Sequence, residues 1–408
     1  MPEIGLILFD DRVARQWEPF ALTRPVGELL FGALKVRERV ETVLDLECIG
    51  HLTSEHLLGF DEPDSPPVLA IEGLPAKQDL LFLSSRLIPS WQGVQIEWGD
   101  EPGPVRVGTE VVGWFAPAGS PRPPTTFLLD PSTSEGDEGH DLGPGRLLEF
   151  PWELITSNAD QLRRDILALF PEAESPELGA GIHLIGESAL IVGANVIIEP
   201  GTVFDLSGGP IWLDNGAEIS AFSRIAGPAY IGRETKILGG KLSEVSVGPV
   251  CRVHGEVESS VILGYSNKSH DGFLGHAYLG SWVNLGALTT NSDLKNNYGS
   301  VRVWTPGGEV DTGEQKIGAL IGDHVKTAIG TLLNTGTVVG AGANLFGTGM
   351  PPSYVPPFSW GIGPGAGEYD LMRFLATTEV VMSRRDIVLS SGQRSLLEAA
   401  WSLARGHT

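Results

Sequence analysis

The sequence predicts an α/β domain with a doubly wound sheet, followed by a left-handed parallel β-helix and C-terminal helices. The main observation is a spacing of six residues. Every sixth position in one stretch is a large aliphatic residue: Leu213, Ile219, Ile225, Ile231 and Ile237. A period of six fits neither an α-helix nor a single strand. It is typical of a hexapeptide β-helix, in which a short strand and a turn repeat and one aliphatic side chain per repeat points inward.

The same spacing recurs in two further runs. One contains Val261, Asn267, Phe273, Leu279 and Leu285, and the other contains Ile321, Thr327, Leu333, Val339 and Leu345. We therefore expect a β-helix domain over residues 182–350, with an insertion near 296–313 that breaks the count.

The first 150 residues have the pattern of an α/β domain. Residues 4–9 and 80–83 are apolar runs typical of buried strands, and 32–46 has helical periodicity with a charged face. Ligands of a doubly wound sheet bind beyond the carboxyl ends of its strands. This rule places Asp10, Asp11 and residues 84–86 at the expected crevice.

The remaining segments are expected to flank the β-helix. Residues 151–181 read as a helix, over 151–170, and a linker. In the segment 351–408, the Pro- and Gly-rich stretch 351–367 should lie along a surface, and two helices should follow, separated near 390–392. Because a solenoid needs its ends covered, these helices are natural caps.

Charge and composition exclude several classes of function. The formal net charge is −23, which argues against a nucleic-acid partner because such a partner requires a basic face. Anionic substrates would need local Lys, Arg and N–H groups, or Mg²⁺. Two cysteines, Cys48 and Cys251, form no disulfide framework. No apolar run approaches the ~20 residues that span a bilayer, and no signal peptide is recognisable. We expect a cytoplasmic protein without a membrane partner.

Reactive side chains concentrate between residues 265 and 296, where His, Lys, Asn and aromatic residues replace the usual small residues of a solenoid. Acyl transfer requires a base, for which histidine is suited, and N–H donors for the oxyanion. Two alternatives stay open. Each histidine could be a hydrogen-bonded surface imidazole, or His254, His270 and His276 could bind zinc between subunits, although no pair has a specific zinc spacing.

The motif Ser-His-Asp-Gly-Phe-Leu-Gly at 269–275, followed by Trp-Val-Asn-Leu-Gly-Ala at 282–287, resembles the acetyltransferase half of the bifunctional bacterial enzymes that make UDP-N-acetylglucosamine. The resemblance implies a catalytic base at His270, with His276 as second choice. It assigns Asn284 to positioning the acetyl group, Lys295 to the substrate and Ala287 to acetyl-CoA. It also implies that Tyr265, Lys268, Phe273, Asn291 and Arg252 bind the substrate.

A shortened variant of that family is more similar still, and the similarity covers nearly the whole chain. Its N-terminal signature resembles Phe9-Asp10-Asp11 and Leu22-Thr23-Arg24-Pro25-Val26-Gly27-Glu28-Leu29. This resemblance implies a nucleotidyltransferase-like domain over residues 1–150. Arg24, Gly27, Arg37 and Arg86 would bind the nucleotide, and Asp10 or Asp11 would bind Mg²⁺. The alternative for Arg24 is a structural ion pair.

Two features depart from the long enzymes. Their glycine-rich nucleotide loop is absent, and the two basic positions that hold the sugar phosphate fall at Gly240 and Glu258. Lys241, Arg252 and Lys268 are the candidates to replace them. The acceptor sugar and the nucleobase therefore stay open.

The predicted function is a bifunctional enzyme that acetylates a hexosamine 1-phosphate from acetyl-CoA and joins the product to a nucleoside triphosphate, such as UTP. A homotrimer is expected, because such solenoids commonly place acyl-CoA between subunits. The alternatives are a single-activity transferase, whose other domain is non-catalytic, and a non-catalytic scaffold that binds sugar nucleotides.

Overall fold

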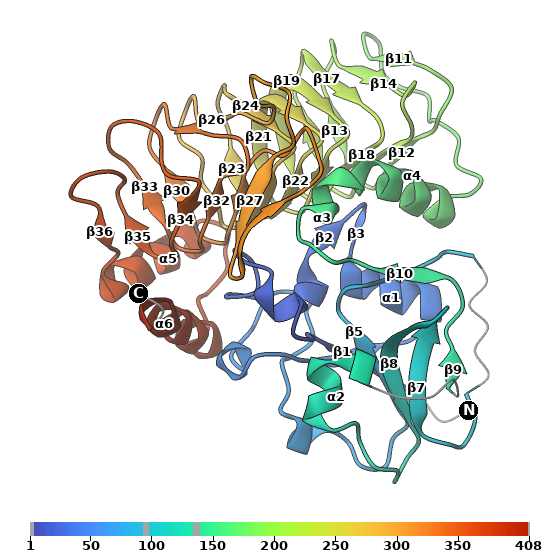
Figure 1. The fold of residues 1–408 in the computed structure, drawn as a ribbon. Helices are drawn as coiled ribbons and strands as arrows, with labels where there is room; N and C mark the ends of the chain where they lie inside the picture. Colours follow the sequence, from blue (N-terminus) through green and yellow to red (C-terminus); the bar gives the residue numbers. More distant parts are fainter. Residues whose placement is uncertain (1–3, 93–97, 134–138, 407–408) are drawn as a thin grey trace.

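The N-terminal domain is built on a six-stranded mixed sheet, in a computed structural model that describes residues 4–92, 98–133 and 139–406 (Figure 1). The strand order is β4-β1-β5-β8-β7-β9. The strands are β1 (Gly5–Phe9), β4 (Cys48–Leu52), β5 (Leu80–Ser84), β7 (Gly103–Val107), β8 (Glu110–Ala116) and β9 (His140–Asp141). β1 pairs in parallel with β4 and β5, whereas β8 is antiparallel to β5 and β7. The α/β prediction is confirmed, and the antiparallel half is an addition that the sequence patterns did not indicate.

The first helix is shorter than predicted. α1 covers Val36–Leu44, because the residues before it form a hairpin of β2 (Leu30–Phe31) and β3 (Leu34–Lys35). Gly32 has a positive φ of 68°, which a glycine adopts without steric cost. A second short helix, α2 (Thr125–Leu129), packs beside the sheet.

The second domain is a parallel β-solenoid. One of its faces is a nine-stranded sheet of stacked short strands that runs from β12 (Leu190–Val192) to β34 (Tyr354–Val355). Ile211 pairs with Ala229, and Leu320 pairs with Val338. Each of these steps advances eighteen residues, or three hexads, so each turn of the coil has three short strands.

The inward positions agree with two of the three predicted runs. All five hexad positions of the run from Leu213 to Ile237 and all five of the run from Ile321 to Leu345 are buried. The run 261–285 was wrong in part, because Asn267 and Phe273 are only half-buried. The register around them places Lys268 above Val253 and Leu274 above Val257, in the interior. A lysine therefore occupies a position that an aliphatic residue fills in the neighbouring turns.

The insertion forms a hairpin of β27 (Arg302–Thr305) and β28 (Gly308–Asp311). Its Val301 and Val303 are buried, and Trp304 stacks on Tyr354 with ring centroids 3.5 Å apart. The Pro- and Gly-rich segment, predicted to lie along a surface, adds β34 and β35 (Ser359–Trp360) to the solenoid. The coil therefore continues beyond residue 350, where the β-helix was expected to end.

The flanking helices cover the sides of the solenoid (Figure 1). The helix expected over 151–170 is divided into α3 (Glu153–Thr156) and α4 (Asn158–Leu169). The two C-terminal helices are confirmed as α5 (Leu371–Ser383) and α6 (Ser391–Arg405), with the Ser390 hydroxyl capping α6 by accepting from the Gln393 N–H. These C-terminal helices pack on Trp282 and Phe358 and also on Leu57 and Phe60 of the first domain. They therefore bridge the two domains rather than cap one end.

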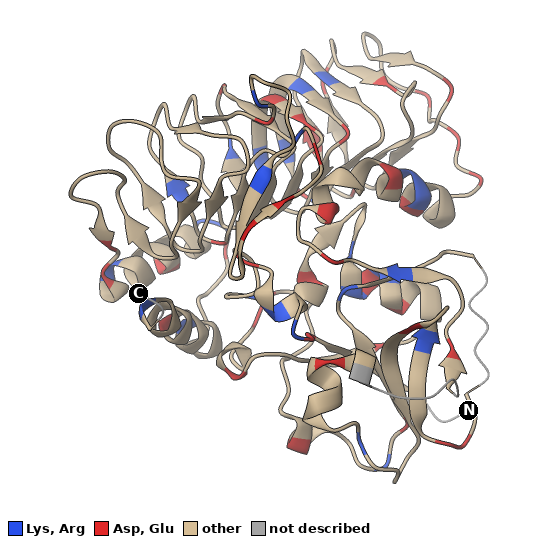
Figure 2. Cartoon of the chain, in the orientation of Figure 1, with Lys and Arg blue, Asp and Glu red and all other residues tan. Residues whose placement is uncertain are grey.

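The two domains share an apolar core. Phe20, Leu30 and Phe31 of the first domain pack with Tyr230 and Tyr278 of the solenoid. The Tyr278 hydroxyl accepts from the Leu30 N–H and donates to the Leu30 carbonyl. Acidic and basic residues are interspersed over both domains (Figure 2). Among the described residues, no helix is long and apolar enough to cross a membrane.

Candidate functional site

An open hollow on the solenoid brings together His270 and Ala287, two residues that the motif assigned to acetyl transfer. The hollow measures about 370 Å³ and is lined by Leu238, His254, Ser269, His270, Asp271, Ala287 and Leu288. His270 is exposed. The part of the chain that the structure describes contains no hydrogen-bond partner for its imidazole, so both ring nitrogens are accessible to a ligand.

Lys268 fixes the backbone on which His270 is carried. Its amine donates to the carbonyl oxygens of His254 and His270, each at 2.8 Å. The side chain is only 3% exposed, and burial lowers its pKa to about 8. Because its amine is buried and bonded to these two carbonyls, Lys268 stabilises the backbone beneath the hollow. Its predicted role as a substrate ligand has no geometric support.

His254 is the second imidazole of the hollow. Its Nδ1 lies 2.9 Å from the Leu238 carbonyl oxygen, and its Nε2 lies 3.1 Å from Asp271 Oδ1. The Asp271 side chain is 76% exposed, so this ion pair is largely screened by water. Both nitrogens of His254 are engaged, which leaves His270 as the imidazole with a free nitrogen in this hollow.

His276 belongs to a different arrangement. Its Nδ1 lies 2.8 Å from Asp293 Oδ2, and both side chains are mostly buried. The hydrogen bond from His276 lowers the pKa of Asp293. A carboxylate that holds one ring nitrogen in this way can orient the other as a base, so His276 is a real competitor to His270. The three histidines do not converge, and the described residues contain no group of three or more that could hold a metal ion.

The structure separates the other predicted acyl-site residues from His270. Asn284 and Tyr265 line a smaller cavity beside α5. The Asn291 amide is pinned to the Gly275 N–H and C=O, the Lys295 amine donates to the Ser300 carbonyl, and the Arg252 guanidinium donates to the carbonyls of Glu234 and Cys251. Phe273 lies on β24 (Phe273–Gly275), next to Gly275. The substrate-binding roles of these residues stay predictions.

The carboxyl edge of the N-terminal sheet carries a crevice of about 530 Å³. Among the residues that line it are Asp11, Arg12 and Arg86, and two of these, Asp11 and Arg86, are residues that we expected at this edge of the sheet. Arg86 Nη2 lies 2.7 Å from Asp11 Oδ2. Neither side chain in this ion pair is more than 7% exposed.

Arg24, Gly27 and Arg37 lie in the interior instead. Arg24 is 1% exposed and pairs with Glu62 and Asp323 at 2.8 and 2.9 Å, as the ion-pair alternative for Arg24 proposed. Arg37 pairs with Glu28 at 2.6 Å and with Glu41. Gly27 packs against Leu8 and His51. Each of these arginines is neutralised by carboxylates, so nucleotide binding by them would require breaking buried ion pairs.

The two aspartates proposed to bind Mg²⁺ do not fit that role. The Asp10 carboxylate accepts from the hydroxyls of Thr53 and Ser85 and from the Val26 N–H. Burial raises its pKa. Both oxygens of Asp11 accept from Arg86. A hard cation needs several free oxygen ligands, and these four oxygens are already engaged.

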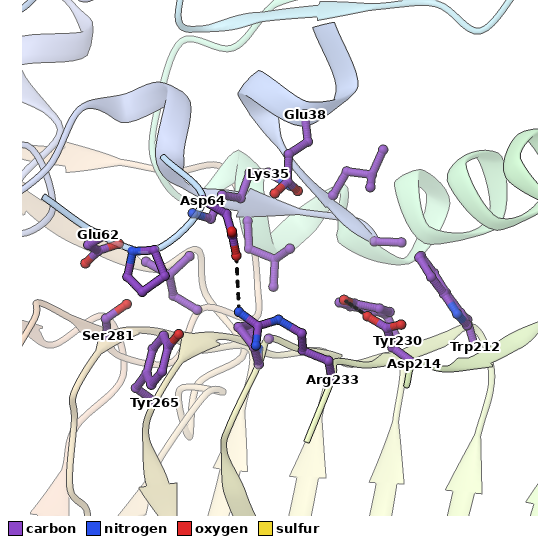
Figure 3. Close-up of a pocket in the computed structure, with 17 residues that line it drawn as sticks. Lys35, Glu38, Glu62, Asp64, Trp212, Asp214, Tyr230, Arg233, Tyr265 and Ser281 are labelled. Atoms are coloured by element: carbon purple, nitrogen blue, oxygen red, sulfur yellow. Dashed lines mark hydrogen bonds and ion pairs between the residues drawn. The ribbon is translucent and has the colours of Figure 1, made fainter. Parts of the chain in front are cut away.

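A further pocket of about 290 Å³ lies between the two domains (Figure 3). The first domain contributes Lys35, Glu38, Glu62 and Asp64, and the solenoid contributes Trp212, Asp214, Tyr230, Arg233, Tyr265 and Ser281. Arg233 Nη2 lies 3.2 Å from Asp64 Oδ2 across the opening. The sequence patterns did not indicate this pocket, because residues from distant segments meet only after the domains dock.

Some residues of the His270 hollow and of the crevice were also missed. Asp271 and Arg12 adjoin predicted residues in sequence, and only their polar character could have indicated them. Leu238 and Leu288 line the hollow at positions outside the hexad frame. The signal that could have identified them in the sequence is a large aliphatic residue at a position that the six-residue frame does not assign to the interior.

Comparison with known proteins gives partial matches. A family model described as sugar nucleotidyl transferase matches residues 6–172, which is less than half of the chain. A bifunctional sugar-1-phosphate nucleotidylyltransferase/acetyltransferase of Sulfurisphaera tokodaii is 34% identical over 91 residues. This match covers 22% of the chain, and the chain spans 23% of that relative. The structure of an Arabidopsis UDP-N-acetylglucosamine acyltransferase matches at 12% identity and a TM-score of 0.25, covering 52% of this chain and 80% of the other.

Proposed function

We propose that the chain is a transferase of sugar-nucleotide synthesis with two active domains. The solenoid would acetylate a hexosamine 1-phosphate, with glucosamine 1-phosphate as the first candidate. The N-terminal domain would join the product to a nucleoside triphosphate, with UTP as the first candidate. The observation that carries the acyl half is the hollow in which His270 and Ala287 meet. The nucleotidyl half is supported by the family match and by the crevice beyond β1 and β5.

In the acyl half, His270 would take a proton from the amine of the hexosamine. The nitrogen would then attack the thioester carbonyl of acetyl-CoA, the carbon–sulfur bond would break, and the thiolate would take up the proton. Ala287 lies beside His270 and would contact the acetyl group through its backbone. A base of this kind contributes ~10²–10⁴-fold to the rate.

In the nucleotidyl half, a phosphate oxygen of the sugar phosphate would attack the α-phosphorus of the nucleotide. The bond to the β-phosphate would break and release pyrophosphate. Arg12, which lines the crevice beside the Asp11–Arg86 pair, is the first arginine that we assign to the phosphates. Mg²⁺ would enter with the nucleoside triphosphate, because the two aspartates do not offer free oxygens.

A homotrimer with acyl-CoA between subunits fits the corner of the solenoid that bears the hollow. Two exposed apolar side chains lie on adjacent turns at this corner: Leu288 lines the hollow and is 56% exposed, and Ile329, which is 78% exposed, precedes Gly330, whose N–H donates to the Ala287 carbonyl. Large apolar groups that cluster on a surface commonly mark an interaction site. Light scattering of the purified protein measures the predicted mass of three chains.

The alternative is a single-activity acyltransferase whose first domain supports the solenoid. A specific observation favours it: Arg24, Arg37 and Arg86 all form buried ion pairs. An assay with acetyl-CoA, glucosamine 1-phosphate and UTP separates the possibilities. Free thiol together with pyrophosphate supports two activities, thiol alone supports the acyltransferase, and neither product with any sugar phosphate or nucleotide contradicts both.

A further inference from the structure

The cavity between α5 and the solenoid has an unusual charge composition. It measures about 210 Å³ and is lined by Tyr265, Asn267, Trp282, Val283, Asn284, Lys326, Val381, Arg384 and Arg385. These residues include three cationic side chains and no carboxylate, in a chain with 51 acidic and 28 basic residues. A local excess of positive charge in an acidic protein is the electrostatic condition for capturing an anion.

The amine of Lys326 is held inside this cavity without a counter-ion. It donates to the carbonyl oxygens of Trp282 and His324 at 2.8 and 3.0 Å. Burial lowers its pKa to about 7. A buried ammonium is costly unless an anion compensates it, so an anion in the cavity would stabilise the protonated form.

Arg385 reaches across from the end of α5 to the solenoid. Its Nη2 donates to Asn267 Oδ1 at 2.9 Å, whereas its Nε is buried and has no hydrogen-bond partner. Burial lowers the pKa of Arg385, and the neighbouring Arg252 and Arg384 lower it further. Basic residues at the C-terminal end of a helix interact favourably with the helix dipole. The dipole does not explain the conformation of Arg385, because its terminal nitrogen is directed at Asn267.

We infer that this cavity binds a phosphate group through Arg384, Arg385 and Lys326. Phosphate oxygens accept several charge-assisted hydrogen bonds at once, and the arginine fork matches their geometry. The Asn267 side chain, whose oxygen accepts from Arg385, also lines the cavity, and its amide donates to Asn284 Oδ1 at 3.3 Å. Inorganic phosphate and a phosphate monoester share this chemistry, and the size of the cavity suits either.

The phosphate site and the hollow around His270 are built from neighbouring residues of the same two stretches of the solenoid. Asn267 and Asn284 line the cavity, and His270 and Ala287 line the hollow. Asn267 precedes His270 by three residues, and Asn284 precedes Ala287 by three residues, a separation that extended backbone spans in ~10 Å. The phosphate site stands on its own donors, however, and does not depend on acetyl transfer.

Calorimetric titration with inorganic phosphate, in a low-salt buffer without other anions, tests the inference. Arg384→Gln and Arg385→Gln should each weaken the binding by at least ~10-fold, because each removes a charged hydrogen-bond donor. Arg373→Gln is the matched control, since Arg373 is exposed on α5, which the two cavity arginines directly follow, and its loss changes the net charge equally. Arg384 is also exposed, so its variant tests the site even if loss of Arg385 disturbs folding.

Three outcomes would overturn the inference. These are no saturable binding at millimolar phosphate, equal affinities for the wild type and both cavity variants, and an equal loss in the Arg373→Gln control. A parallel titration with glucosamine 1-phosphate distinguishes the source of the phosphate. Tighter binding than inorganic phosphate identifies a monoester as the ligand, and weaker binding restricts the site to the free ion.

Discussion

Arg24 and Asp323 form a buried ion pair between the two domains, with Arg24 Nη2 2.9 Å from Asp323 Oδ2. The same carboxylate accepts from the Thr23 hydroxyl at 2.7 Å, and its Oδ1 accepts from the Ser281 N–H. The Arg24 guanidinium also pairs with Glu62. Arg24, which was predicted to bind a nucleotide, thus attaches the first domain to the solenoid.

Removing Asp323 should destabilise the protein by ~3–5 kcal/mol, because the buried Arg24 guanidinium would lose one of its two carboxylate partners. The measurement is the free energy of unfolding of Asp323→Ala by urea titration. Glu218→Ala is the matched control, since its partner Lys236 and Glu218 itself are 36% and 39% exposed. An exposed pair should change stability by no more than ~1 kcal/mol. Equal losses in the two variants would contradict the coupling role of Asp323.

Replacing Lys268 should impair acetyl transfer without removing the base. Lys268→Met leaves the carbonyl oxygens of His254 and His270 without their donor. We expect a loss of ~1–3 kcal/mol in stability and a lower kcat. Because His270 remains, the pH dependence of kcat should keep its shape. Lys236→Met, which removes a half-exposed lysine paired with Glu218, is the control. A kcat equal to that of the wild type would contradict a positioning role for Lys268.

Stability should fall in acid because of His324. This imidazole lies between Trp282 and Phe374, and burial lowers its pKa to about 3. The unfolded chain binds a proton near pH 6.5, whereas the folded chain does not, so stability is lost as the pH falls below that value. The loss between pH 6.5 and 5 should be ~1–2 kcal/mol.

His324→Gln should remove this part of the pH dependence. The comparison is the slope of the unfolding free energy against pH for the two proteins, measured by urea titration. His183→Gln is a suitable control, since His183 is exposed at the start of the solenoid. Parallel slopes for the wild type and His324→Gln would contradict the assignment.

The six-residue period predicted the solenoid because each short strand with its turn takes six residues and directs one aliphatic side chain inward. It failed at Asn267 and Phe273, because the next residue along the chain, Lys268 or Leu274, faces the interior instead. Lys268 is accommodated because two backbone carbonyls accept its protons, and no local pattern shows that these carbonyls converge. Only two strands of the mixed sheet were predicted, β1 and β5, whose runs 4–9 and 80–83 are strongly apolar, whereas the parallel β4 and the antiparallel strands were not.

The candidate site was predictable where one short motif contained it. His270 and Ala287 are seventeen residues apart, which is about one turn of the solenoid, so the motif could bring them together. Arg24 and Asp323 lie on different domains, and nothing local in the sequence distinguishes a buried ion pair from a phosphate ligand. The cavity with Arg385 was missed for the same reason, because α5 meets Asn267 only in the folded chain.

The most direct test of the account is the rate of thiol release from acetyl-CoA, with glucosamine 1-phosphate as acceptor, in His270→Gln and His276→Gln. The account predicts a loss of at least ~10²-fold in His270→Gln, with unchanged folding by circular dichroism. The His276→Gln variant should keep most of its activity. A full rate in His270→Gln, together with a large loss in His276→Gln, would contradict the account and move the base to the His276–Asp293 pair.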